Sequence, residues 1–326
     1  MSNMARLTYD PFPFVFSRGD EPTRLWCLAF FGLSDSPRGR SGLLKLLKQQ
    51  RSDGTFASAL DDDTWGMRET VRNGLLLLRV GLPPQGINVA SAVTFILAHQ
   101  NADGGWCENP SLDIPPFVQI FLSNEQSVTW VTADAIELLR QVGLGDRAEC
   151  QRAVVWLRAM QNEHGGWPSY AKPVGARRGT GDPDVTAQIT FLMREIYGER
   201  DPAYRKGREL LEQHLSDTMQ DVERGYRVRS ADGQREEVEV YQLTHLLLSW
   251  VGDLPRRIDS GYNASDRRVK RMMEALIETQ RDDGGWRPFW AEESSPVYTV
   301  LAVKALVLTG VLSRTDLEAD VKVLAG

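Results

Sequence analysis

The stretch QNADGGW, from Gln100 to Trp106, decides how this chain is organised, because the sequence repeats it. QRDDGGW, ending at Trp286, is nearly identical; QNEHGGW and QRSDGTF keep the same order of residue types, and QDVERGY is a weaker fifth copy. The first glutamines of the copies are Gln50, Gln100, Gln161, Gln220 and Gln280. The steps between them are 50, 61, 59 and 60 residues. Such a regular step indicates a repeat architecture.

A second series of residues gives an independent count of the repeats. Long apolar segments such as VTADAIELLRQVG each end in a glycine, and these are Gly32, Gly81, Gly143, Gly198, Gly252 and Gly310. Glycine is favoured just past a helix because it adopts the left-handed conformation there without strain. Each repeat is therefore predicted to be an apolar helix ending at Gly, followed by a more polar helix ending at Gln.

Six glycines and five junctions predict six helical hairpins. The apolar helices need to be enclosed, whereas amphipathic ones such as AECQRAVVWLRAMQ can face water on one side. These demands predict an all-α, (α/α)6 toroid of six inner and six outer helices. We expect one domain over residues 1–326, with residues 1–19 as an N-terminal extension. Trp106, Trp167 and Trp286 are predicted to pack the junctions rather than to act in catalysis.

The composition narrows the class of function. Hydrophobic residues make up 42% and charged residues 25% of the chain, which fits a sizeable core. A net charge of −6 and the absence of basic runs argue against a nucleic-acid partner. The three cysteines are scattered, and no segment reads as a signal peptide or membrane span. We expect a cytoplasmic protein in a reducing compartment.

The repeated Gln-x-x-Asp-Gly-Gly-Trp in helical hairpins resembles the QW repeat of the squalene-hopene and oxidosqualene cyclase superfamily. Class II diterpene cyclases and protein prenyltransferase β subunits share that toroid. Class II cyclases carry an Asp-x-Asp-Asp motif at the start of an inner helix, often followed by Thr-Ala. Here GDPDVTAQ matches it except that Val185 replaces the last Asp. The resemblance implies that Asp184 is the proton donor and Asp182 its supporting partner.

The chemistry of alkene protonation fits two carboxyl groups at this place. The acid must stay protonated near neutral pH, and burial or a second carboxylate raises a carboxyl pKa. The cation that forms is best met by aromatic faces. Aromatic residues at or just before predicted inner helices are candidate substrate-binding residues: Trp130, Tyr241, Phe289, Trp290 and Tyr298. The competing interpretation of Asp184 is a helix N-cap, a position that favours Asp.

Two other acidic positions compete with Asp184. The stretch LDDDTWG places Asp61 to Asp63 before the second inner helix, whose start is predicted near Val71, with Asp62 as the candidate acid. This stretch also reads as a solvated turn or as a contact for a metal through hard oxygen ligands. Glu239, at the start of the fifth inner helix, is the third candidate. The sequence leaves open whether Asp184 or the Asp61–Asp63 cluster supplies the proton.

Two loops are longer than a turn requires. The first carries Arg177 and Arg178 just before Asp182, and such an arginine pair could hold a diphosphate. It also reads as a solvated basic loop. The second, residues 112–122, is apolar and predicts either packing on the barrel or a lid or peripheral membrane contact.

The preferred hypothesis is a class II-like terpene cyclase that acts on an isoprenoid of C15–C20 size, either a prenyl diphosphate or a prenylated acceptor. No redox or organic cofactor is expected, and Mg²⁺ enters only if the substrate carries a diphosphate. The alternatives are a toroid that binds a lipid or protein without catalysis, and a protein-prenyltransferase β-subunit-like protein. The latter requires zinc ligands, for which Cys107, Cys150, His214 and His245 show no convincing spacing.

Overall fold

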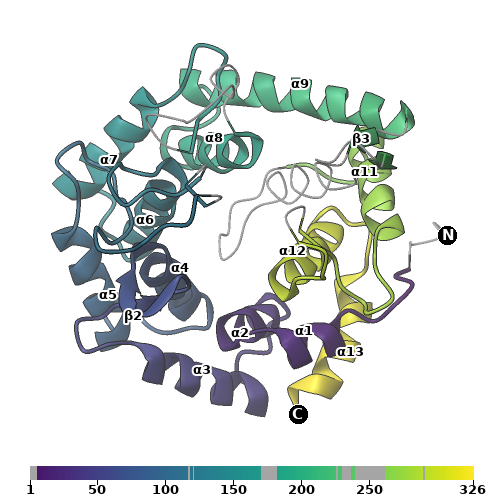
Figure 1. The fold of residues 1–326 in the computed structure, drawn as a ribbon, viewed down its shortest axis with the longest axis horizontal. Helices are drawn as coiled ribbons and strands as arrows, with labels where there is room; N and C mark the ends of the chain where they lie inside the picture. Colours follow the sequence, from purple (N-terminus) through teal and green to yellow (C-terminus); the bar gives the residue numbers. More distant parts are fainter. Residues whose placement is uncertain are drawn as a thin grey trace. The chain divides into compact units, whose positions relative to one another are not determined.

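The computed structural model describes residues 6–116, 118–119, 121–169, 182–224, 227–229, 236–238, 261–288 and 291–326, the residues from 217 to 238 by their backbone alone. Helices dominate, and the strands of these ranges form two short two-stranded ribbons (Figure 1). The all-α prediction is confirmed. The chain forms two compact units: Met1–Arg40 with Leu211–Gly326, the first unit, and Ser41–Leu210, the second unit.

Helices of the second unit form two layers. The apolar helices α4 (Met67–Arg79), α6 (Thr129–Gln141) and α8 (Pro183–Tyr197) lie side by side, α6 between the other two. Helix α5 (Ile87–Ala98) packs on α4, and α7 (Ala148–Ala159) packs on α6 (Figure 1). Residues 129–139 of α6 are all buried, whereas α7 buries one face. The helices predicted as inner therefore form one layer, which we call the inner layer.

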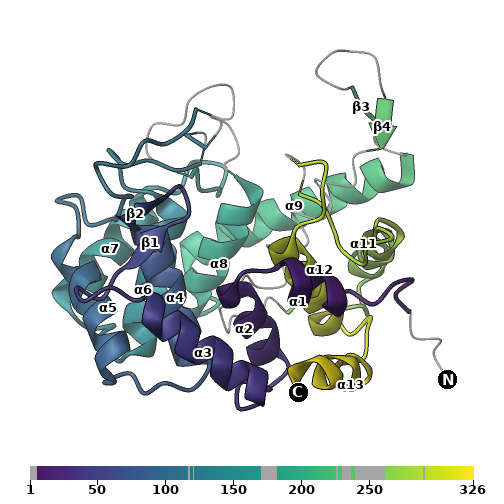
Figure 2. The same ribbon diagram turned by 60° about the horizontal axis from the view of Figure 1, so that its bottom comes forward.

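The remaining helices are α3 (Pro37–Gln49) and α9 (Pro202–Arg224), together with those of the first unit. Helices of the first unit are α1 (Phe12–Arg18), α2 (Glu21–Phe30), α11 (Arg267–Glu278), α12 (Pro296–Leu308) and α13 (Arg314–Ala325). Helix α12 packs on α1, α2 and α11, and α1 also packs on α13 (Figure 2). The ribbon β3–β4, Arg227–Arg229 with Glu236–Val238, belongs to the first unit.

Each tryptophan of the motif joins its turn to the helix that precedes it. Trp106, Trp167 and Trp286 are at most 1% exposed. Each indole Nε1–H donates to the backbone carbonyl ten residues earlier, in the preceding helix, at 2.7–2.8 Å. A buried indole needs such an acceptor. The prediction that these residues are structural is confirmed.

The glutamine of the motif joins neighbouring repeats. In four copies its Nε2–H₂ donates to the glycine carbonyl of its own turn and to a backbone carbonyl of another segment of the chain. These second acceptors are Asn88, Glu149, Ala203 and Tyr9. The first three lie in α5, α7 and α9, but Tyr9 precedes α1. The N-terminal segment, expected to be an extension, thus takes in the first unit the place that the next outer helix holds elsewhere.

The glycines that end the apolar helices adopt the predicted conformation. Positive φ angles of 76° to 98° occur at Gly32, Gly81, Gly143, Gly198 and Gly310. Gly252 lies outside the described residues. The first glycine of the motif also has positive φ, and at Gly165 a Cβ would lie 2.4 Å from the carbonyl oxygen of Lys206. Only glycine allows the turn to approach the next helix this closely.

A short β-ribbon precedes α4 and was not predicted. Strands β1 (Phe56–Ser58) and β2 (Asp61–Gly66) pair antiparallel, and Phe56 lies opposite Gly66. Helix α4 begins at Met67, so the predicted start near Val71 was wrong by one helical turn. The ribbon delivers the chain directly to the inner layer.

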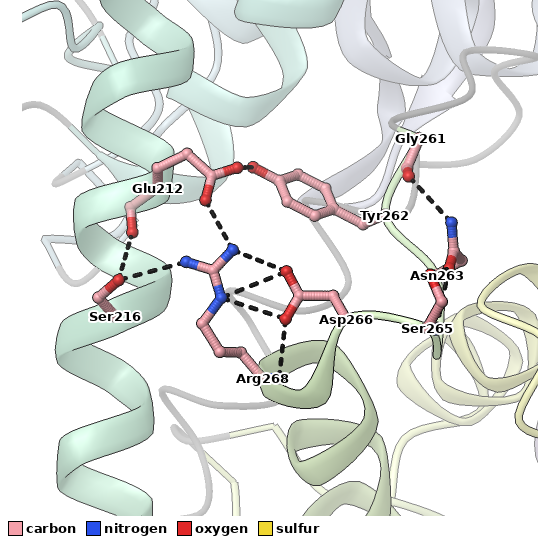
Figure 3. A network of polar contacts seen from close by, with 8 residues as sticks. All are labelled: Glu212, Ser216, Gly261, Tyr262, Asn263, Ser265, Asp266 and Arg268. Atoms are coloured by element: carbon pink, nitrogen blue, oxygen red, sulfur yellow. Dashed lines mark hydrogen bonds and ion pairs between the residues drawn. The ribbon is translucent and has the colours of Figure 1, made fainter.

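A polar network fastens α11 to α9 in the first unit (Figure 3). Asp266, the N-cap of α11, accepts from the backbone and guanidinium of Arg268. The same guanidinium donates to Glu212 of α9 at 2.8 Å, and the Tyr262 hydroxyl donates to the other oxygen of Glu212 at 2.9 Å. The hydrogen bonds that Asp266 accepts from Arg268 lower the pKa of Asp266. About a third of the Arg268 side chain is exposed, so this network adds modestly to stability.

Candidate active site

A threonine fixes the register of the inner helices against the motif. The backbone N–H of the aromatic residue that ends the motif donates to a threonine Oγ1 in the following inner helix, at 2.9–3.1 Å. These anchor threonines are Thr70, Thr132, Thr186 and Thr299. All four are buried. Positions on different inner helices can therefore be compared by counting from the anchor threonine.

The anchor threonines explain part of the acidic motif. In the stretch from Asp182 to Ala187, Thr186 binds Trp167 N–H, as Thr132 binds Trp106 N–H. Thr132 is also followed by alanine. The threonine of the motif is thus a structural feature of the repeat, and the catalytic content of the resemblance rests on the two aspartates.

Asp182 and Asp184 occupy different positions at the start of α8. Asp182 is the N-cap residue, but its Oδ2 accepts from the backbone N–H and the hydroxyl of Ser169 at 2.8 and 2.5 Å. These two hydrogen bonds hold Ser169 next to Asp182. Asp184 follows Pro183 in the first helical turn and is half-buried. The N-cap interpretation thus applies to the position of Asp182, and Asp184 lies one step inside the helix.

Polar and aromatic side chains of the neighbouring helices α4, α6 and α8 contact one another along the inner layer. Gln188, one turn along α8, donates to the backbone carbonyl of Trp130 at 3.0 Å. Trp130 stands two residues before its anchor threonine, as Asp184 does. Arg72 of α4 lies over the Trp130 ring, its Cζ 5.1 Å from the centroid, and its Nε is 3.7 Å from Oδ2 of Asp134. Residues four apart share a helix face, so these side chains line one face of the inner layer.

The other predicted substrate-binding residues are only partly placed. Trp130 is 9% exposed, and its Nε1–H donates to the carbonyl of Phe121 at 2.8 Å. Tyr298 is 8% exposed at the start of α12, in the first unit. Tyr241, Phe289, Trp290, Arg177, Arg178 and Glu239 lie outside the described residues. The role of each stays a prediction.

The acidic stretch from Asp61 to Asp63 lies on strand β2, and its side chains are exposed. The Thr64 hydroxyl donates to the carboxylate of Asp61, and this hydrogen bond lowers the pKa of Asp61. An exposed carboxylate with a lowered pKa is a poor reservoir for an initiating proton. Asp62, next to it, is equally exposed.

Sequence reasoning missed a buried carboxyl group two residues after Trp106. Glu108 is 1% exposed and accepts from the backbone N–H groups of Met67 and Arg68 at 2.8 and 3.1 Å. It thereby caps α4, whose own N-cap is Gly66 and has no side chain to do so. Burial, and next the charge of Glu69, raise the pKa of Glu108 to about 7. No local sequence signal marks this residue, because its burial depends on the helix that it caps.

Replacing Glu108 with glutamine is expected to change the pH dependence of stability. The folded protein raises the pKa of Glu108 from 4.5 to about 7, so folding favours the protonated form. Wild-type stability should therefore fall as the pH rises from about 4.5 to about 7 and then level off. Glu108→Gln should lack this fall, which urea unfolding at pH 5 and pH 8 would measure. Glu125→Gln, at an exposed loop position, is the control. A pH-independent difference between wild type and Glu108→Gln would contradict the assignment.

The apolar loop 112–122 buries four of its nine described residues. Its buried residues are Leu112, Ile114, Val118 and Leu122. Phe121 is only partly buried, and its carbonyl accepts from Trp130. Phe117 and Ile120 lie outside the described residues. The described part of the loop is therefore tied to the inner layer.

No group of three His, Cys, Asp or Glu side chains has metal-site geometry in the described part of the chain. Cys107 follows the second motif, Cys150 lies in α7 and His214 lies in α9, while His245 is not described. Within the same ranges, no helix combines the length and apolar character that a membrane crossing demands.

Two protein-family models match the repeated part of the chain. The model of the squalene-hopene cyclase C-terminal domain matches residues 23–197, and that of the prenyltransferase alpha-alpha toroid domain matches residues 113–325. Each match covers more than half of the chain. No curated protein sequence shows significant similarity to the chain.

Solved structures with a similar fold include type II terpene cyclases. The apo form of MstE from Scytonema has a TM-score of 0.54 at 15% identity, with 89% of this chain and 88% of that chain covered. A variant in complex with its product merosterolic acid A has a TM-score of 0.55 at 16% identity, with 90% and 88% covered. The ent-copalyl diphosphate synthase from Streptomyces platensis has a TM-score of 0.50 at 18% identity, with 89% and 50% covered.

At these identities the solved structures show the fold alone, and they agree with the family models that the fold is an α/α toroid. The repeated motif, the helices that end at glycine and the two family-model matches all indicate this fold. The chain belongs to the family of squalene-hopene cyclase C-terminal and prenyltransferase α/α-toroid domains.

Proposed function

We propose that the protein is a class II-like terpene cyclase, which begins the cyclisation of an isoprenoid by protonating an alkene. The observation that carries the proposal is the position of Asp184. It is a half-buried carboxyl group in the first turn of an inner helix, on the face that also holds Trp130. Membership of the toroid family supports this assignment.

In this mechanism the carboxylic acid of Asp184 gives its proton to one carbon of a substrate double bond. The other carbon becomes a cation, which the next double bond attacks to close a ring. Loss of a proton from a neighbouring carbon restores an alkene. Asp182, held by Ser169, acts through its charge and by fixing the chain next to Asp184. A positioned general acid contributes typically 10²–10⁴-fold to a rate.

The substrate class is proposed from the solved relatives. One structure of MstE holds geranylgeranyl dihydroxybenzoate as its substrate. We infer a C15–C20 prenyl diphosphate or a prenylated acceptor for this chain. The test is to incubate the purified protein with farnesyl diphosphate, geranylgeranyl diphosphate and geranylgeranyl dihydroxybenzoate, and to analyse products by mass spectrometry. Cyclised isomers support the proposal, and binding without products favours a non-catalytic toroid.

We also propose that residues 1–326 form one toroid domain. The family matches support this, because they overlap over residues 113–197 and together span residues of both units. A cytoplasmic location is part of the proposal, supported by the free thiols of all three cysteines. Peripheral membrane contact through residues 112–122 would depend on Phe117, Ile120 and the partly buried Phe121, since the apolar side chains Leu112, Ile114, Val118 and Leu122 are buried. Co-sedimentation with vesicles of neutral phospholipid tests this contact.

A further inference from the structure

An arginine is held in a fixed position on the same face of the inner layer as Asp184. Arg72 stands two residues after its anchor threonine on α4, and Asp134 and Gln188 stand at the same position on α6 and α8. Three neighbouring helices thus place polar side chains in one row. Two of the three carry charge, and outer helices pack on two of the three inner helices, α5 on α4 and α7 on α6.

The two charged residues of the row differ in exposure. The Asp134 side chain is 2% exposed, whereas the Arg72 side chain is 43% exposed. The carboxylate therefore lies behind the guanidinium. A buried carboxylate needs a positive partner, so the ion pair serves Asp134 and at the same time holds the guanidinium of Arg72 in place.

The Trp130 ring supports the guanidinium from a second side. Arg72 Cζ lies 5.1 Å from its centroid, within the range of a cation–π contact. The ring is itself fixed, because its Nε1–H donates to Phe121 and the Trp130 carbonyl accepts from Gln188. A guanidinium held by a carboxylate and an aromatic face has lost most of its conformational freedom before any ligand arrives. Such preorganisation favours the binding of an anion.

We propose that Arg72 binds an anionic head group of the isoprenoid, with Asp134 as the residue that positions it. This inference rests on the proposed function for the nature of the substrate, and it adds that the substrate carries a diphosphate or a carboxylate. Both present oxygens that a guanidinium can bind in a bidentate way. Asp184 and Arg72 lie on helices separated by α6, about 16–20 Å at ordinary helix spacings. A chain bound between them places its charged end far from its protonated end.

The test measures binding rather than turnover, in the Asp184→Asn background, by titration calorimetry. The ligands are geranylgeranyl diphosphate, geranylgeranoic acid and the neutral geranylgeraniol. Arg72→Met should weaken binding of at least one anionic ligand by about 10- to 100-fold. Binding of the neutral alcohol should be unchanged. The anionic ligand whose binding is weakened shows whether Arg72 recognises a diphosphate or a carboxylate. Arg140→Met, at an exposed position near the end of α6, is the matched control and should bind all three normally.

Arg72→Met leaves Asp134 buried without this partner and so endangers folding. The double variant Arg72→Met with Asp134→Asn removes both charges, and it should fold and show the same selective loss. Asp134→Asn alone should weaken anion binding less, because Arg72 remains but is held less firmly. Two results would overturn the proposal. One is that the Asp184→Asn protein binds the anionic ligands equally well with and without the Arg72→Met and Asp134→Asn changes. The other is that the Asp184→Asn protein with Arg72 and Asp134 intact binds neither anion. Selective binding without any cyclisation would support this inference and contradict the proposed function.

Discussion

Asp184→Asn should abolish cyclisation while leaving the protein folded and able to bind its isoprenoid. Asparagine keeps the shape of the side chain, but its amide does not donate the initiating proton. The loss should be at least about 10²–10⁴-fold, the usual contribution of a general acid. Asp184 is the second residue of α8 and does not occupy the cap itself, so the melting temperature should change little. Product analysis and circular dichroism melting on the same sample measure both quantities.

Two further variants locate the acid. Asp182→Asn should give a milder loss of activity, because an asparagine oxygen can still accept from Ser169 while the neighbouring charge is removed. Asp62→Asn, on the exposed strand β2, should be fully active. An inactive Asp62→Asn beside an active Asp184→Asn would move the acid to the ribbon.

Among the proposed substitutions, Trp106→Ala should cause the largest decrease in the free energy of unfolding. The side chain is fully buried, and its Nε1–H donates to Ile96 at 2.8 Å. Truncating such a residue leaves a cavity and an unpaired carbonyl, which together cost about 3–5 kcal/mol in the free energy of unfolding. Trp156→Ala, at a half-buried position of α7, should cost clearly less. Urea unfolding followed by circular dichroism compares the two, and equal losses would contradict the stapling role of the motif.

The helical hairpins were predictable because they depend on local chemistry repeated many times. The glycine after each apolar helix and the motif before the next one needed no tertiary knowledge. Strands β1 and β2 were missed because their pairing uses backbone groups, and the exposed aspartates from Asp61 to Asp63 read as a turn. The hydrogen bond between Tyr9 and Gln280 spans 271 residues, so nothing in the local sequence around Tyr9 indicates it.

The candidate site was less predictable, because its features arise between repeats. In the sequence, Thr186 looks like part of an acid motif. In the structure, a threonine at the equivalent position anchors each of the four motif copies whose contacts are described. The row of Arg72, Asp134 and Gln188 could have been found by aligning the repeats on that threonine. Nothing in the local sequence separates buried Glu108 from a solvated glutamate, since burial depends on the helix that it caps.

The most direct test of acid-initiated cyclisation is to run the reaction in D₂O with the wild-type protein. Protonation by Asp184, which exchanges its proton with solvent, should place one deuterium at a carbon of the cyclised product. Mass spectrometry should show a gain of one mass unit that back-exchange in H₂O does not remove. A cyclic product without deuterium would contradict the account, because the first cation would then arise by loss of a leaving group and not by protonation.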